Sequence, residues 1–372
     1  MDNLTHTLLG AALAETGLKR WTPFATATLI IGANFPDIDI ITWLFGQDAY
    51  LEHHRGLTHA LALWPLLSVL LAGMIFLFSR WRKDRSKDIK LRARFGPLLI
   101  LSLLSIITHP LLDFTNSYGW KPFQPWNNNW YYGDTAFVID PWVWLLLGGA
   151  LCLATAKTHL RLILWAILFV ILAVTIFTLG PRTPLKSLWA ILAICILAIR
   201  TLTMRRKLPA RSIAIASLTI LLAYFGTRVW LHRNTIDQLN ARAAEIISNG
   251  QVKQVNALPT PLNPLHWQAV FVTDQKYYVT DYALNQSSIT DLVQYPRESG
   301  DTAAIAAARQ TPQFQTFLRF ARFPVFEAIP APNQTIEVAV SDVRFIDVNR
   351  QARSSFRRVV RLDQNLKPIV EN

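Results

Sequence analysis

Long apolar runs over the first 230 residues constrain the fold of this chain more than any other feature. A helix needs about 20 mainly apolar residues to cross the hydrocarbon core of a bilayer. Six runs meet or approach this length, at residues 58–79, 96–112, 138–156, 161–179, 186–200 and 212–231. Two shorter runs, 4–18 and 23–36, precede them and contain Thr, Gly and Ala. We therefore expect a mainly α, polytopic transmembrane helical bundle of about eight spans, whose first two are short and form a hairpin or a re-entrant element.

The last 140 residues have a different character, typical of a small water-soluble domain. Residues 267–273 and 277–282 have the pattern of β-strands, and the Ala- and Gln-rich residues 302–321 predict helical structure. The chain as a whole is 16% charged, below the ~25% of soluble domains, and the deficit falls in the apolar part. We therefore predict a transmembrane helical domain over residues 1–231 and a C-terminal α+β domain over residues 232–372.

Lysine and arginine are unevenly distributed between the loops on the two sides of the predicted bundle. The loops 19–20, 80–94, 157–161 and 200–211 together carry 17 of them, whereas the opposite short loops carry four. Because short cytoplasmic loops are enriched in these residues, we expect a multi-pass protein of the inner or plasma membrane, with an extracytoplasmic C-terminal domain. The net charge of +13 then reflects orientation in the membrane, and no nucleic-acid partner is expected.

Histidine and aspartate are concentrated at the predicted outward ends of the first spans. Five of the eight histidines lie in the first 109 residues. His109 and Asp113 are four residues apart, so they share a helix face. Asp37 and Asp39 alternate in a segment that we expect to be extended, so at least one can face inward. The full set of candidates is His6, Asp37, Asp39, His54, Arg55, His59, His109 and Asp113. Each histidine alone fits a structural role at a helix end, whereas the set indicates a shared metal site.

The segment between the His109 motif and the run 138–156 leaves two questions open. Asp134 and Asp140 fit a place in the metal site and, equally well, a place as negative charge at a helix N-terminus. The loop 113–137 is rich in Trp and Tyr, which favour the headgroup layer of a membrane. These aromatic residues predict either an interfacial belt or a lip that admits a lipid headgroup to the metal.

The ligand types of this set indicate its chemistry. Imidazole and carboxylate groups without thiolates suit Zn²⁺, with Mn or Fe as alternatives, and we expect one to three divalent transition-metal ions. Ionisable side chains at membrane depth are costly and usually functional. A metal cluster lowers the pKa of bound water and clamps an in-line displacement at phosphorus.

We therefore predict a membrane-bound metal-dependent hydrolase, in particular a phosphoesterase that acts on a lipid or other amphiphilic substrate at the outer membrane face. In this hypothesis Asp39 or His54 positions the water or protonates the leaving group, and Arg55 clamps a phosphate. The alternative is a transporter or ion-responsive membrane protein that uses the same His/Asp cluster.

The same motifs resemble the YdjM-like family of membrane-bound metal-dependent hydrolases. The matching pieces are Asn3-Leu4-Thr5-His6, Pro36-Asp37-Ile38-Asp39, His54-Arg55-Gly56-Leu57-Thr58-His59, His109-Pro110-Leu111-Leu112-Asp113 and Asp140-Pro141, within about residues 1–145. The resemblance implies metal-ligand roles for His6, Asp37, His59, His109 and Asp113. It also implies a distant similarity to zinc-dependent phospholipase C and P1-type nucleases. This chain lacks the second downstream His with His-x-x-x-Glu that the soluble members of that group use.

Overall fold

Residues 1–86, 92–247, 251–284, 291–346 and 356–369 are described by a computed structural model. The chain divides into two units. The first comprises Met1–Asp39, Arg55–Trp230 and Thr260–Pro264, and the second comprises Ile40–His54, Leu231–Pro259 and Leu265–Asn372.

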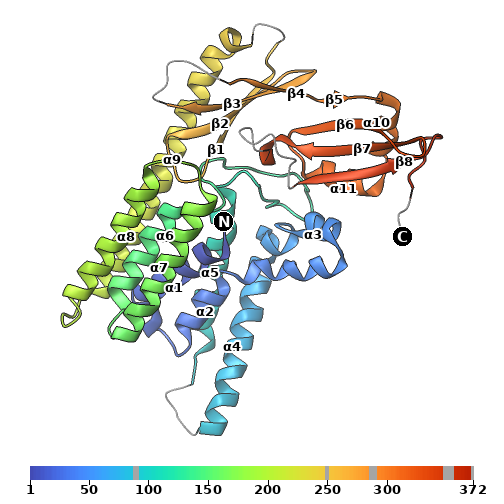
Figure 1. Ribbon diagram of the computed structural model, residues 1–372. Coiled ribbons are helices and arrows are strands. Elements are labelled where there is room, and N and C mark those ends of the chain that lie inside the picture. Colours follow the sequence, from blue (N-terminus) through green and yellow to red (C-terminus); the bar gives the residue numbers. More distant parts are fainter. Residues whose placement is uncertain (87–91, 248–250, 285–290, 347–355, 370–372) are drawn as a thin grey trace. The chain divides into compact units, whose positions relative to one another are not determined.

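The first unit is built from helices that run beside one another (Figure 1). They are α1 (Asn3–Glu15), α2 (Ala25–Gly32), α4 (Trp64–Ser86), α5 (Phe95–Phe114), α6 (Pro141–Thr155), α7 (His159–Leu179), α8 (Leu185–Leu202) and the first part of α9 (Ala210–Ile246). Each of the eight apolar runs identified in the sequence overlaps one of these helices. The prediction of a polytopic helical membrane part is confirmed.

Fewer helices reach spanning length than the sequence predicted. In the described part of the chain, five helices are long and apolar enough to cross a membrane. A sixth span results if α2 and the 3-10 helix η2 (Phe35–Phe45), bent by 47°, are counted as one. α1 has 13 residues and α6 has 15. At 1.5 Å per residue they are roughly 20 and 23 Å long, shorter than the ~30 Å hydrocarbon core. The expected bundle of about eight spans, the first two short, therefore has five or six of full spanning length within the described residues.

α1 and α2 form the expected hairpin, turned at the 3-10 helix η1 (Leu18–Arg20). The two helices approach closely because α1 carries a glycine at the crossing: a Cβ at Gly10 would lie 2.5 Å from the carbonyl oxygen of Leu29. Asp2 caps α1 by accepting from the backbone N–H of Thr5 at 3.0 Å, and the Trp144 indole on α6 donates to the same carboxylate at 3.0 Å. α1 is thus fixed between α2 and α6.

The outer surface of the first unit suits contact with lipid. On α7, the apolar side chains of Leu160, Ile163, Leu164, Ile167 and Val170 are each at least half exposed. Exposed aliphatic residues along a long helix are unfavourable in water and are favourable in hydrocarbon.

The described part of the second unit contains two four-stranded sheets, three short α-helices, the second part of α9 and the 3-10 helix η6 (Val343–Phe345) (Figure 1). The first sheet has the order β1 (Gln254–Pro259), β2 (His266–Val272), β3 (Lys276–Ala283), β4 (Val293–Pro296), with all neighbours antiparallel. The second has the order β5 (Glu298–Ser299), β6 (Pro324–Ala331), β7 (Thr335–Asp342), β8 (Arg357–Leu362), with β5 and β6 parallel. The short α-helices are α3 (Gln47–His53), α10 (Thr302–Arg309) and α11 (Pro312–Phe320). Trp267, Phe271, Phe314 and Phe317 are fully buried in this unit. The predicted small α+β domain is confirmed.

Candidate metal centre

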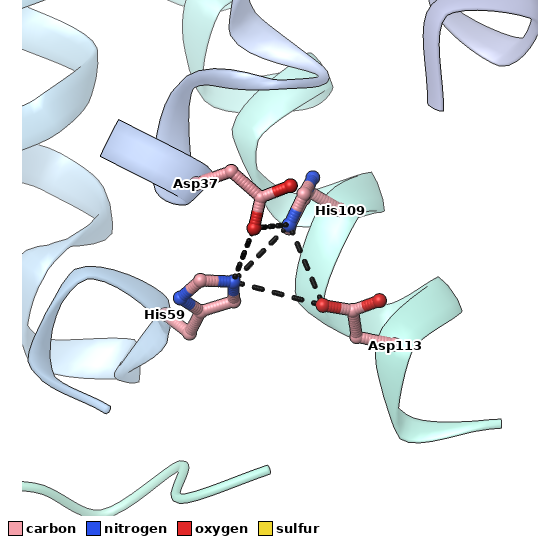
Figure 2. A group of neighbouring side chains, drawn as sticks. All are labelled: Asp37, His59, His109 and Asp113. Carbon is pink, nitrogen blue, oxygen red and sulfur yellow. Dashed lines mark hydrogen bonds and ion pairs between the residues drawn. The ribbon is translucent and has the colours of Figure 1, made fainter. Parts of the chain in front are cut away.

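Four of the predicted ligands meet in the first unit, at the ends of three separate segments. Asp37 lies at the start of η2, His59 ends the 3-10 helix η3 (Leu57–His59), and His109 and Asp113 occupy the last turns of α5. Figure 2 shows their side chains pointing toward one another. One ligand atom from each of the four lies within 4.8 Å of all the others.

The separations between these atoms fit one small cation. The Nε2 atoms of His59 and His109 are 3.1 Å apart. Asp37 Oδ1 lies 3.4 and 3.3 Å from these two nitrogens, and Asp113 Oδ2 lies 3.6 and 3.4 Å from them. Four ligands arranged tetrahedrally at 2.0–2.2 Å from one zinc ion would be roughly 3.3–3.6 Å apart. The four side chains are therefore spaced as a metal would hold them.

Hydrogen bonds define which nitrogen of each imidazole carries its proton. His109 Nδ1 lies 2.7 Å from the carbonyl oxygen of Ala33, which can only accept. The Thr58 hydroxyl donates to Asp39 Oδ2 at 3.0 Å, so it accepts from His59 Nδ1, also at 3.0 Å. Both Nδ1 atoms are therefore donors, and the lone pairs of both Nε2 atoms face the same point. Two lone pairs and two carboxylates repel one another unless a cation lies between them.

Asp37 and Asp39 have different environments because the segment after Pro36 is not extended. It forms the 3-10 helix η2, with three residues per turn, so positions two apart point in different directions. The expectation of an extended segment is wrong at this point. Asp37 faces the other ligands and accepts from the Asn3 side chain at 2.9 Å. Asp39 is buried behind His59, 3.3 Å from its Nδ1.

His6 lies beside the four ligands, on the other oxygen of Asp113. Its side chain is fully buried, its ring stacks on His109 with centroids 3.8 Å apart, and its Nε2 is 3.4 Å from Asp113 Oδ1. Neither ring nitrogen forms a hydrogen bond within the described residues. A buried imidazole without hydrogen bonds is costly, and a metal ion on this side of Asp113 would satisfy it. The α-amino nitrogen of Met1 contacts the same oxygen.

Arg55 and His54 are adjacent in sequence but have different partners. The buried Arg55 guanidinium lies 3.0 Å from Asp113 Oδ1 and donates to the Asn116 side chain at 2.9 Å. Its backbone N–H donates to Asp39 Oδ2 at 3.1 Å. His54 belongs to the second unit, where its ring stacks on Tyr50 with centroids 4.6 Å apart.

Asp140 and two aromatic residues of the loop 113–137, whose roles the sequence left open, now have places. Asp140 accepts from the backbone N–H of Trp142 at 2.9 Å, so it caps α6, and its other oxygen accepts from the Tyr224 hydroxyl at 2.6 Å. From the aromatic loop, Trp120 is buried and donates its indole N–H to the carbonyl of His59 at 3.1 Å, whereas Trp126 is 79% exposed. Trp120 thus holds the backbone of His59, whereas Trp126 is exposed and suits the headgroup layer of a membrane.

Sequence reasoning missed the residues that orient the ligands. Asn3, Thr58 and Asn116 hold Asp37, His59 and Arg55 respectively. A signal was present for the first, because Asn3 and His6 are three residues apart and share a helix face. Thr58 gave no such signal, since its role depends on the geometry of η3.

Comparisons with known proteins find matches to the part of the chain that contains this candidate centre. A family model described as YdjM inner membrane protein matches residues 1–182. A protein of Bacillus subtilis (strain 168), described as uncharacterized protein YfhP, is 27% identical over 155 residues. That match covers 39% of this chain and 43% of the relative. No solved structure matches significantly, and the distant similarity to zinc phospholipase C and P1-type nucleases stays a prediction. The resemblance to the YdjM inner membrane protein family is confirmed over residues 1–182, which hold every predicted metal ligand.

Proposed function

We propose that this protein is a metal-dependent hydrolase of the inner membrane that cleaves phosphoester bonds in a lipid or other amphiphile. The observation that carries the proposal is the convergence of two imidazole lone pairs and two carboxylates at metal-ligand spacing. A divalent ion bound there would lower the pKa of a bound water molecule and would act as a Lewis acid on a phosphoryl oxygen. Zinc suits this donor set, with manganese and iron as alternatives, and His6 provides a ligand for a further ion.

The chain's own residues supply the rest of the chemistry. Asp39 and Thr58 fix the His59 ring, because a carboxylate and a hydroxyl together hold its Nδ1 proton. Arg55 is a fixed cation beside Asp113, and its planar guanidinium suits a phosphate oxygen. Asp37 is the ligand open to its surroundings: its side chain is 19% exposed, against at most 2% for the other three. We infer that substrate approaches from the Asp37 side, and that this end of the bundle and the C-terminal domain face outward.

The test is elemental analysis of the detergent-purified protein together with a screen of phosphodiesters and phospholipids. We expect bound transition metal and turnover in the wild type. Both should be lost in His59→Ala and in the nearly isosteric Asp37→Asn, because each removes a ligand. His159→Ala is the matched control, since His159 is exposed at the start of α7. A wild-type protein without metal, or with metal content unchanged by both ligand variants, would contradict the proposal.

One observation favours the second candidate, a transporter or ion-responsive protein. His59, His109 and Asp113 are almost completely buried within a helical membrane unit, and buried ionisable groups also mark ion pathways. Uptake of a divalent metal into vesicles, abolished by Asp113→Asn in the absence of any turnover, would support this candidate. Turnover without uptake would exclude it.

A further inference from the structure

A basic cavity lies in the first unit, at the end of α1 that is far from His6. Its volume is about 510 Å³, and it is formed by η1, the end of α6, the end of α8 and the start of α9. Half of the residues that line it are lysine or arginine. Within the described residues, Glu15 is the one acidic residue in its wall, and this carboxylate is paired with Lys19 at 2.5 Å. Three of the four basic loops noted in the sequence therefore meet around one cavity.

Arg200 gives this cavity an unusual feature. It is only 2% exposed, and its guanidinium donates to the carbonyl oxygens of Ala156 at 2.8 Å and Thr203 at 3.2 Å. In the part of the chain that the structure describes, it forms no ion pair. Carbonyl oxygens satisfy its hydrogen bonds but leave its charge uncompensated, which is costly for a buried cation. An anion in the cavity would supply the missing charge.

Membrane orientation alone does not require this arrangement. Charges that orient a bundle need only lie in loops on one side. Arg80 and Arg82 on α4 show that case: both are exposed, they lie over the rings of Phe76 and Phe78, and they do not line the cavity. The residues around Arg200 differ because they enclose a volume and bury a guanidinium.

We propose that this cavity binds a phosphate-bearing anion, the headgroup of an anionic phospholipid. Guanidinium groups match phosphate oxygens in charge and geometry, and basic pockets between membrane helices suit lipid headgroups. The volume lies within the usual range of small-ligand sites, and Leu153, Met204 and Leu208 give the wall an apolar part that suits a glycerol or acyl segment. This site is separate from the metal centre and does not depend on its chemistry.

The experiment uses the full-length protein in neutral detergent. Native mass spectrometry should show retained phosphatidylglycerol or cardiolipin, and phosphatidylglycerol in mixed micelles should raise the unfolding temperature, whereas phosphatidylcholine should not. Arg205→Gln/Arg206→Gln removes two exposed cavity charges in a turn after α8, so the fold should tolerate it. We expect this variant to bind phosphatidylglycerol about thirtyfold more weakly.

The control is Arg80→Gln/Arg82→Gln, which removes the same charge outside the cavity and should bind as the wild type does. A separate arm adds inorganic phosphate without lipid. If phosphate alone stabilises the wild type but not the cavity variant, the site is supported and its occupant is a soluble phosphate compound. Equal lipid binding by the two double variants, or no response of the wild type to either phosphatidylglycerol or phosphate, overturns the proposal.

Discussion

At the scale of single residues, Thr58 orients the His59 ring and selects its tautomer through a hydrogen bond to Nδ1. Its hydroxyl donates to Asp39 and accepts from His59 Nδ1, so the Nε2 lone pair is directed at the metal position. Thr58→Val keeps the shape of the side chain and removes both hydrogen bonds of the hydroxyl group. We expect metal affinity to fall by about 10–100-fold, the usual effect of losing a group that orients a metal-bound histidine. Competition with a chelator measures the affinity.

Thr175→Val is the control for this substitution, because Thr175 is partly exposed on α7 and its hydroxyl donates to the carbonyl of Ile171. Equal metal affinity in Thr58→Val and wild type would show that Thr58 has no orienting role. Spacing predicted that His109 and Asp113 share a helix face, and the family resemblance implied the ligand roles of Asp37 and His59. The role of Thr58 could not, since it depends on hydroxyl and ring rotamers that no spacing encodes.

At the scale of elements, the position of α1 depends on its glycine contact with α2. A methyl group at Gly10 would press on the backbone of Leu29 and Ile30 and push the helices apart. We expect Gly10→Ala to destabilise the protein by about 1–3 kcal/mol. Gly73→Ala on α4 is the matched control, because a Cβ there meets nothing within 4 Å and alanine favours helix. Thermal unfolding in detergent tests this, and equal unfolding temperatures of the two variants would contradict it.

Most of the helices and two of the strands could be predicted from the sequence. Apolar runs predicted all the helices of the first unit, and alternation predicted β2 and β3. The 3-10 form of η2 was not predicted, because Pro36 favours an extended residue before it and tertiary contacts decide the rest. The short length of α1 was expected, whereas that of α6 was missed, since a hydropathy run does not report where a cap such as Asp140 begins a helix.

At the scale of the whole molecule, a bound ion would connect segments that are far apart in the chain. It would join η2, η3 and α5, so its removal should destabilise the first unit. We expect a chelator to lower the unfolding temperature of the wild type and added zinc to restore it. At a hundredfold excess of zinc over its dissociation constant, the free energy of unfolding should rise by about 2.7 kcal/mol. His59→Ala should respond to neither. An unchanged wild-type transition in chelator would contradict a structural contribution from metal.

The convergence of basic loops around the cavity is also a property of the whole molecule. The sequence showed the charges and predicted their side of the membrane, but not that loops 19–20, 157–161 and 200–211 enclose a volume that Arg80 and Arg82 do not line. That distinction depends on which helices are neighbours, such as α6 with α8.

The order of the ligands along the chain has a consequence for biosynthesis. All the ligands of the centre lie before residue 114 of a 372-residue chain. A nascent polypeptide therefore carries the complete ligand set while most of the protein is still to be translated. The contact of Trp144 with Asp2, which needs a later part of the chain, would then fix α1 beside the candidate ligands. Metal delivery during membrane insertion would consequently precede the folding of the C-terminal domain.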